Sequence, residues 1–180
     1  GFDPRRVIGT GTQLDSARFK HVLSRETGID QHSIGAYMLG EHGATQFACW
    51  SQVNFGGKPL AELEREQPER FSFDRPALED AARQGGYVAM AGKMCTEYAV
   101  ADAAARLVRA VVSNEHAVLA CSTLVDGVYG EEGLFCSVPC VVGGSGVEAL
   151  MVPDLTEPEQ AAFHASCAHI RENLSRVGLA

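Results

Sequence analysis

One histidine stands where its side chain could transfer protons. His42 lies in the segment Gly40-Glu41-His42-Gly43, directly after the apolar run Ala36-Tyr37-Met38-Leu39. We predict that this run is a strand followed by a glycine-framed turn, so that the imidazole emerges at the end of the strand. Histidine titrates near neutral pH and therefore suits general acid–base catalysis. The alternative interpretation is a loop histidine without a catalytic role.

A carboxylate and a guanidinium lie close together in an earlier segment. Asp15 and Arg18 are three residues apart in a stretch with helical apolar spacing, so they share one face of the predicted helix. One interpretation is a surface ion pair, which contributes little to stability. The other is that the carboxylate orients a histidine while the planar guanidinium binds an anionic substrate through two hydrogen bonds.

The helices that must position these side chains follow from the hydrophobic pattern. Apolar residues at helical spacing predict a first helix from Leu14, which Gly28 caps at its C-terminal end. Residues 97–112 predict a well-packed helix. A capping-box pattern, Thr156-Glu157-Pro158-Glu159, begins the last helix. The apolar positions of that last helix are Phe163, Cys167, Ile170 and Leu174.

Apolar runs separated by short turns predict the sheet. Residues 118–121, 134–142 and 147–152 have the composition of strands, and the short spacing favours antiparallel pairing. Gly143-Gly144-Ser145-Gly146 predicts a hairpin turn rather than a phosphate-binding loop, because no Lys-Ser/Thr pair follows it. The predicted fold class is α+β, with an antiparallel sheet packed against long helices.

Two further regions have less regular patterns. Residues 55–76 are rich in glycine, proline and charge, and we expect an irregular connection with a short element. From Pro76 an alanine-rich region follows, interrupted by Gly85-Gly86 and Gly92.

Length and charge exclude several function classes. The chain has 180 residues, with 15 Lys and Arg against 23 Asp and Glu, a net charge of −8. We expect one domain over residues 1–180. The acidic balance argues against a nucleic-acid binder and against a surface for anionic membranes. The apolar runs are shorter than the roughly 20 residues of a membrane span, and the N-terminus lacks the apolar core of a secretory signal.

The cysteines and histidines indicate neither a disulfide framework nor a metal site. Six cysteines are scattered without a CxxC pair, which predicts buried free thiols in a reducing cytoplasm. The six histidines form no HxxxH or HExxH pattern, so we predict no bound metal. A hydrolase dyad of Cys49 with His42 has suitable residue types but no surrounding signature.

The first segments resemble one enzyme family. Residues 7–19, Val-Ile-Gly-Thr-Gly-Thr-Gln-Leu-Asp-Ser-Ala-Arg-Phe, resemble the segment of NAD-dependent L-lactate dehydrogenases that holds the substrate arginine and the aspartate partner of the catalytic histidine. Gly40-Glu41-His42-Gly43 resembles the histidine motif of the same family. The resemblance extends over residues 5–178. Its other matches, in order, are Trp50-Ser51, Gly56-Gly57-Lys58-Pro59-Leu60, residues 93–96, Ser137-Val138-Pro139 and Val141-Val142-Gly143.

The resemblance implies a role for each matching residue. It implies the fold of the lactate/malate dehydrogenase C-terminal domain and the interconversion of pyruvate and (S)-lactate with NAD. In that scheme His42 transfers the proton at the substrate oxygen, Asp15 holds its tautomer, and Arg18 binds the substrate carboxylate. The remaining implied positions are Thr96 at the substrate, Val100 against the nicotinamide and Thr10 near its carboxamide.

The resemblance covers only half of such an enzyme. No GxGxxG opens the chain, so we expect the NAD-binding Rossmann domain, together with the family's mobile-loop arginine, to be absent from it. The chain begins at Gly1 rather than Met, as an excised or processed fragment would. The isolated chain is therefore expected to be inactive. Its implied partners are a small 2-oxo or 2-hydroxy acid, its own Rossmann domain, and further copies in a dimer or tetramer.

Three departures from the family pattern leave alternatives open. Lys20 and Gly35 stand where allosteric members bind fructose 1,6-bisphosphate with Arg and His, which puts that activation in doubt. Ala44 replaces an acidic residue. Gly85-Gly86 could leave room for a larger substrate, as in an L-2-hydroxyisocaproate dehydrogenase. The alternative is that the pair serves helix flexibility or close packing. Malate dehydrogenase is a second alternative, and a non-catalytic oligomerisation or regulatory module with the same fold is a third.

Overall fold

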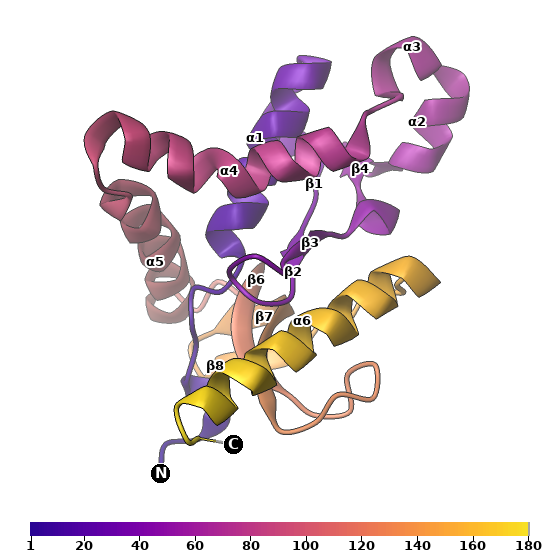
Figure 1. The fold of residues 1–180 in the computed structure, drawn as a ribbon. Coiled ribbons are helices and arrows are strands. Elements are labelled where there is room, and N and C mark those ends of the chain that lie inside the picture. Colours follow the sequence, from indigo (N-terminus) through magenta and orange to yellow (C-terminus); the bar gives the residue numbers. More distant parts are fainter. Residues whose placement is uncertain (180) are drawn as a thin grey trace.

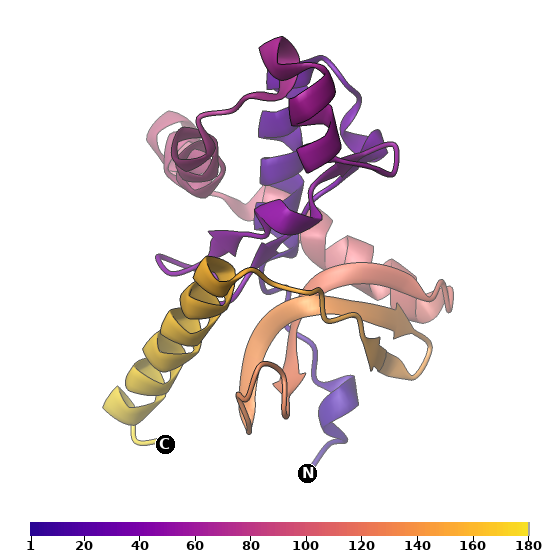
Figure 2. The same ribbon diagram turned by 90° about the vertical axis from the view of Figure 1, so that its right-hand side faces the viewer.

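The largest sheet is antiparallel, as the hydrophobic runs predict. Figure 1 shows the computed structural model, which describes residues 1–179. The sheet has the order β6 (Ala117–Val125), β7 (Leu134–Gly143) and β8 (Gly146–Leu150). Residues 143 and 146 pair across the predicted hairpin turn. Figure 2 shows how strongly β6 and β7 curve.

Three long helices surround the site elements. Helix α1 (Gln13–Thr27) ends at Gly28, whose φ of 70° provides the predicted left-handed cap. Helix α4 (Arg75–Lys93) continues through its three glycines and crosses α1, as Figure 1 shows. Helix α5 (Glu97–Val112) has the predicted bounds and packs on β7.

The last helix begins as its capping box predicts. In α6 (Glu157–Arg176), the N–H and hydroxyl of Thr156 both donate to the Glu159 carboxylate, at 2.9 Å each. Phe163 and Cys167 are fully buried, so α6 packs its predicted apolar face against the sheet. The α+β fold class is therefore confirmed.

The region between residues 55 and 76 is more regular than expected. A hairpin of β4 (Asn54–Phe55) and β5 (Lys58–Pro59) turns at Gly56 and Gly57, which have φ values of 60° and 85°. Two short helices follow, α2 (Leu60–Glu66) and α3 (Pro68–Phe71). Their large apolar side chains, Leu60, Leu63 and Phe71, are buried, which fixes a segment that composition alone marked as irregular.

Only the second half of the run before the histidine motif is a strand. Its first part lies next to β1 (Ile34–Gly35), which pairs with β4. Its second part is β2 (Met38–Leu39), which pairs with β3 (Phe47–Ala48). The predicted strand is therefore correct for residues 38–39, while residues 36–37 connect the two sheets.

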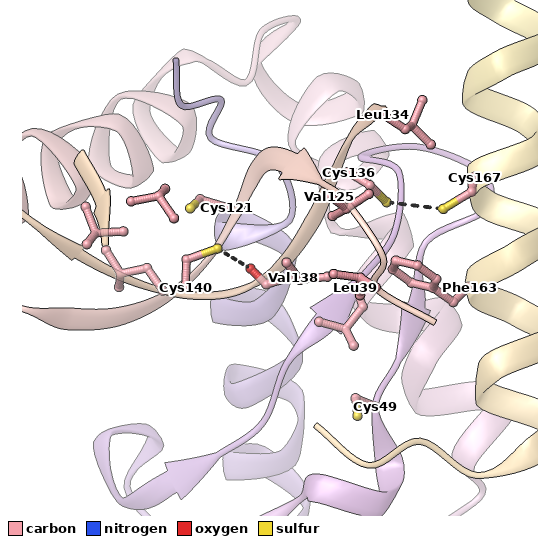
Figure 3. Close-up of a cluster of buried hydrophobic side chains, with 14 of the residues drawn as sticks. Leu39, Cys49, Cys121, Val125, Leu134, Cys136, Val138, Cys140, Phe163 and Cys167 are labelled. Atoms are coloured by element: carbon pink, nitrogen blue, oxygen red, sulfur yellow. Dashed lines mark hydrogen bonds between the residues drawn. The ribbon is translucent and has the colours of Figure 1, made fainter. Parts of the chain in front are cut away.

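Two hydrophobic clusters stabilise the molecule. One lies between the large sheet, β2, β3, α5 and α6, and contains five of the six cysteines (Figure 3). All six thiols are free, as predicted, but only five are buried, because Cys95 is partly exposed. The Sγ atoms of Cys136 and Cys167 lie 3.9 Å apart. The other cluster joins α1 to α2, α3 and α4 through aromatic side chains such as Phe19, which is fully buried and 4.9 Å from the Trp50 ring.

Helix α5 is less well packed than its composition suggested. Only Ala103, Leu107 and Ala110 are buried among its residues. Large apolar side chains of α4, α5 and their connection are exposed instead: Tyr87, Val88, Met90, Met94, Tyr98, Val100, Val108 and Val112. We call these residues the α4–α5 apolar surface. Exposed apolar side chains that gather in this way are typical of a surface that contacts another protein segment.

No helix within residues 1–179 combines the length and the apolar character that a membrane span requires.

Core packing predicts a large effect at Phe163. Because its ring is fully buried and lies 5.1 Å from that of Tyr129, Phe163→Ala should lower the free energy of unfolding by about 3–5 kcal/mol. The matched control is Phe2→Ala, since Phe2 is 90% exposed and should change stability by less than about 0.5 kcal/mol. Urea denaturation of both variants measures the difference. Equal losses would show that α6 does not pack as described.

Candidate active site

A buried carboxylate lies at the centre of the site. Asp15 is in the first turn of α1, where the helix dipole favours negative charge, and its side chain is 1% exposed. Its Oδ2 lies 2.6 Å from Nδ1 of His42, and its Oδ1 accepts a hydrogen bond of 3.3 Å from Nη1 of Arg18. The three residues singled out in the sequence are thus brought together through one carboxylate.

Buried hydroxyl groups hold the first turn of α1. The Thr12 hydroxyl donates to the carbonyl oxygen of Met38 at 2.5 Å, and the Thr12 N–H donates to Oγ of Ser137 at 3.1 Å. The N–H of Met38 donates to Oγ of Ser16 at 3.0 Å. Strand β2 and the start of α1 are therefore linked in both directions, which fixes Asp15 relative to the strand that leads to His42.

The histidine loop is held from two sides. Gly40 exchanges backbone hydrogen bonds with Ser137 of β7, at 3.1 and 3.0 Å. The N–H of Glu41 donates to Oγ of Ser166 in α6 at 2.7 Å. Gly40 has a φ of +92°, and a Cβ there would lie 2.5 Å from Oγ of Ser166. A side chain at position 40 would therefore separate the loop from α6.

The electrostatics of the site favour a charged imidazole. The hydrogen bond that His42 donates to the Asp15 carboxylate raises the pKa of His42 above its ordinary value of 6.5. This effect outweighs burial and the nearby Arg18 charge, which lower the pKa. Among the described residues, Nε2 of His42 has no hydrogen-bond partner, and the side chain is 52% exposed. This nitrogen is free to exchange a proton with a ligand.

The histidine opens onto a cavity of about 540 Å³. Thr96, at the N-terminal end of α5, and Val100, one turn further, line this cavity together with the Asp15 group. Thr10 lies before α1, outside the lining. The other lining residues are Leu14, Gly43, Ala44, Gln46, Asp80, Arg83, Gln84, Gly86, Tyr87 and Met90. The lining thus combines charged groups with apolar side chains, which suits a small organic acid together with an apolar ring.

Two other kinds of site find no support in the geometry. Cys49 is buried, and burial raises the pKa of its thiol to about 12, so it is not a nucleophile for His42. Within residues 1–179 there is no group of three side chains that could together ligate a metal ion.

Comparisons with known proteins show the family and the fold of this chain. The sequence profile of the lactate/malate dehydrogenase alpha/beta C-terminal domain matches residues 12–178. The chain belongs to the lactate/malate dehydrogenase family. An L-lactate dehydrogenase of Fusobacterium nucleatum is 40% identical over 173 residues, which are 96% of this chain and 54% of that protein.

Solved structures of the family have the same fold. The ligand-bound minor L-lactate dehydrogenase of Enterococcus mundtii matches 100% of this chain and 57% of its own, with a TM-score of 0.94 and 35% identity. A malate dehydrogenase of Cryptosporidium parvum matches 97% of this chain and 56% of its own, with a TM-score of 0.88 and 29% identity. This chain therefore spans about half the length of the family members that it matches.

The residues that support the site were missed in the sequence. Thr12, Ser16, Ser137 and Ser166 are all buried, and their hydroxyls hold Asp15 and the His42 loop. The available signal was a single small polar residue within an apolar stretch, as with Ser137 in β7. Such a residue must find a hydrogen-bond partner in the core, because an unpaired buried hydroxyl is costly.

The raised pKa of His42 is expected to depend on Asp15. Asp15→Asn removes both the hydrogen-bonded charge and its Coulombic attraction, so burial and Arg18 should then lower the pKa of His42 below that of the unchanged protein. NMR titration of the His42 ring measures this. Asp30→Asn, a change of the same kind in an exposed loop, should leave the His42 titration unchanged. An Asp15→Asn variant with an unaltered His42 pKa would contradict the assignment.

Ser166 is expected to hold the histidine loop against α6. Ser166→Ala leaves the Glu41 N–H without its acceptor and should cost about 1–3 kcal/mol of stability. Ser175→Ala, at an exposed position of the same helix, is the control and should have little effect. Thermal denaturation compares the two. Equal stabilities would mean that the Glu41–Ser166 hydrogen bond contributes nothing.

Proposed function

We propose that this chain is the substrate-binding and catalytic half of an NAD-dependent L-lactate dehydrogenase that interconverts pyruvate and (S)-lactate. The proposal rests on one observation: the Asp15 carboxylate contacts both His42 and Arg18, and all three residues line one cavity. The relatives with 35–40% identity that are named L-lactate dehydrogenase support the choice of substrate.

His42 is the proposed acid and base. In pyruvate reduction, the protonated ring donates its Nε2 proton to the carbonyl oxygen of the substrate while Asp15 stabilises the imidazolium through Nδ1. Because the pKa of His42 is raised, this protonated form persists above pH 6.5 and is lost as the pH rises through the raised value. Lactate oxidation uses the neutral His42 ring as a base, so its rate should rise as the pH rises through the pKa of His42.

Arg18 is the proposed carboxylate binder. Its side chain is 19% exposed and lines the cavity, and its Nη1 atom donates a hydrogen bond to the Asp15 carboxylate. The planar guanidinium keeps further N–H groups for two parallel hydrogen bonds to a substrate carboxylate. Thr96 lies on the same cavity and would contact the bound substrate.

The residues present fit a nicotinamide ring at one side of the cavity. Val100 is 41% exposed and lines the cavity on α5, which provides an apolar contact for a flat ring. NAD, when bound, would take up the hydride from C2 of lactate, and its reduced form NADH would supply the hydride to C2 of pyruvate. Thr10 would contact the carboxamide from outside the lining of the cavity.

The whole enzyme requires more protein than this chain. We propose that a Rossmann domain binds most of the NAD and, with further copies in a dimer or tetramer, covers the α4–α5 apolar surface. The free buried thiols fit a reducing compartment such as the cytoplasm.

The activity test compares the full-length protein that contains this chain with the 180 residues alone. With NADH, the full-length protein should reduce pyruvate faster than oxaloacetate or 2-oxoisocaproate, and the isolated chain should show no turnover. Arg18→Lys should lower kcat/KM for pyruvate about 10- to 100-fold, mainly through KM, because lysine cannot make the paired hydrogen bonds. Arg25→Lys, an exposed change in the same helix, is the control. A full-length protein that reduces no 2-oxo acid would refute the proposal.

A further inference from the structure

Two adjacent glycines, Gly85 and Gly86, lie in the middle of α4, next to Arg18 of α1. Figure 1 shows that α4 crosses α1. Glycine destabilises the interior of a helix relative to alanine, so a Gly85-Gly86 pair needs a physical reason. Neither residue has a positive φ, and the backbone itself would therefore accept alanine at both positions.

The reason is the side chain of Arg18. A Cβ at Gly85 would lie 3.1 Å from Cδ and 3.3 Å from Nε of Arg18, closer than ordinary van der Waals contact. A Cβ at Gly86 would lie 3.4 and 3.5 Å from the two Nη atoms, at the edge of ordinary contact. Gly92 of the same helix has nothing within 4 Å of its Cβ position, so contact with Arg18 is particular to the pair.

The guanidinium is thus fixed from two directions. Asp15 holds one Nη atom at 3.3 Å, and the backbone of the glycine pair limits the position of the outer half of the side chain. Arg18 and Gly86 both line the cavity. A guanidinium that makes two hydrogen bonds to one carboxylate must be held in the correct orientation, and contacts of this kind provide it.

We propose that Gly85 and Gly86 are positioning residues, which set the location of Arg18 so that it binds the carboxylate shared by all 2-oxo acid substrates. This inference rests on the proposed function. It differs from the interpretation in which the glycines make room for the side chain of a large substrate. A positioning role affects every substrate with a carboxylate alike, whereas a spacing role affects substrates according to their size.

The experiment compares Gly85→Ala, Gly86→Ala and Gly92→Ala in the full-length protein. All three add a methyl group to one helix and favour its formation, so loss of folding should not obscure the result. Displacement of Arg18 by a few tenths of an ångström in Gly85→Ala should raise KM about five- to tenfold, with a smaller change in kcat. Gly86→Ala should raise KM about twofold, and Gly92→Ala should not change it.

The decisive comparison is between pyruvate and 2-oxoisocaproate. The proposal predicts that Gly85→Ala raises KM for both by the same factor and weakens oxamate binding, measured by calorimetry with NADH, to a similar degree. A KM that rises for 2-oxoisocaproate alone would overturn it in favour of substrate spacing. A Gly85→Ala variant that behaves as Gly92→Ala would also overturn it.

A readout that is independent of turnover separates this inference from the proposed function. The NMR signal of the Arg18 Nε–H group should shift in Gly85→Ala and stay unchanged in Gly92→Ala. If the unchanged protein reduces no 2-oxo acid, the proposed function fails, while the shift still tests the contact between Gly85 and Arg18. If the protein is active and the signal does not move, the positioning role alone is refuted.

Discussion

A carboxylate that is 1% exposed must have partners, because the transfer of an unpaired charge into a protein interior is too costly. Asp15 finds its partners in Arg18, on its own helix, and in His42, on a distant loop. The helix N-terminus adds a favourable dipole. The burial of this one group therefore requires the first turn of α1, the histidine loop and the guanidinium to lie in a fixed arrangement, and that arrangement is the candidate active site.

The rest of the fold is organised around this requirement. Hydroxyl groups of Thr12 and Ser16 link α1 to β2, while Ser137 links both α1 and the histidine loop to the large sheet. Ser166 joins the same loop to α6. These contacts explain why a site built on a short loop can be held accurately: each backbone segment beside the reacting groups is hydrogen-bonded to a rigid element. Residues of α4 and α5 complete the lining of the cavity, and three of them, Tyr87, Met90 and Val100, also belong to the α4–α5 apolar surface.

Local signals in the sequence predicted the local structure well, and contacts between distant segments explain what it missed. The capping box at Thr156 and the glycine at position 28 act within one turn of a helix. The start of α6 and the end of α1 could therefore be predicted from neighbouring residues alone. The grouping of His42 with Asp15 followed from the family resemblance. The partners of Ser166 lie 121 and 125 residues away, and no pattern along the chain reveals them. Residues 55–76 were misjudged for a similar reason, since the burial of their apolar side chains depends on α1 and its neighbours.

The central claim is that Asp15 fixes His42 in one tautomer and leaves Nε2 for the substrate. The most direct test is a measurement of the two ring ¹⁵N chemical shifts of His42 above its pKa, where the ring is neutral. The geometry predicts a proton on Nδ1, hydrogen-bonded to the carboxylate, and an unprotonated Nε2. A neutral ring with its proton on Nε2, or a rapid exchange between both tautomers, would contradict the account.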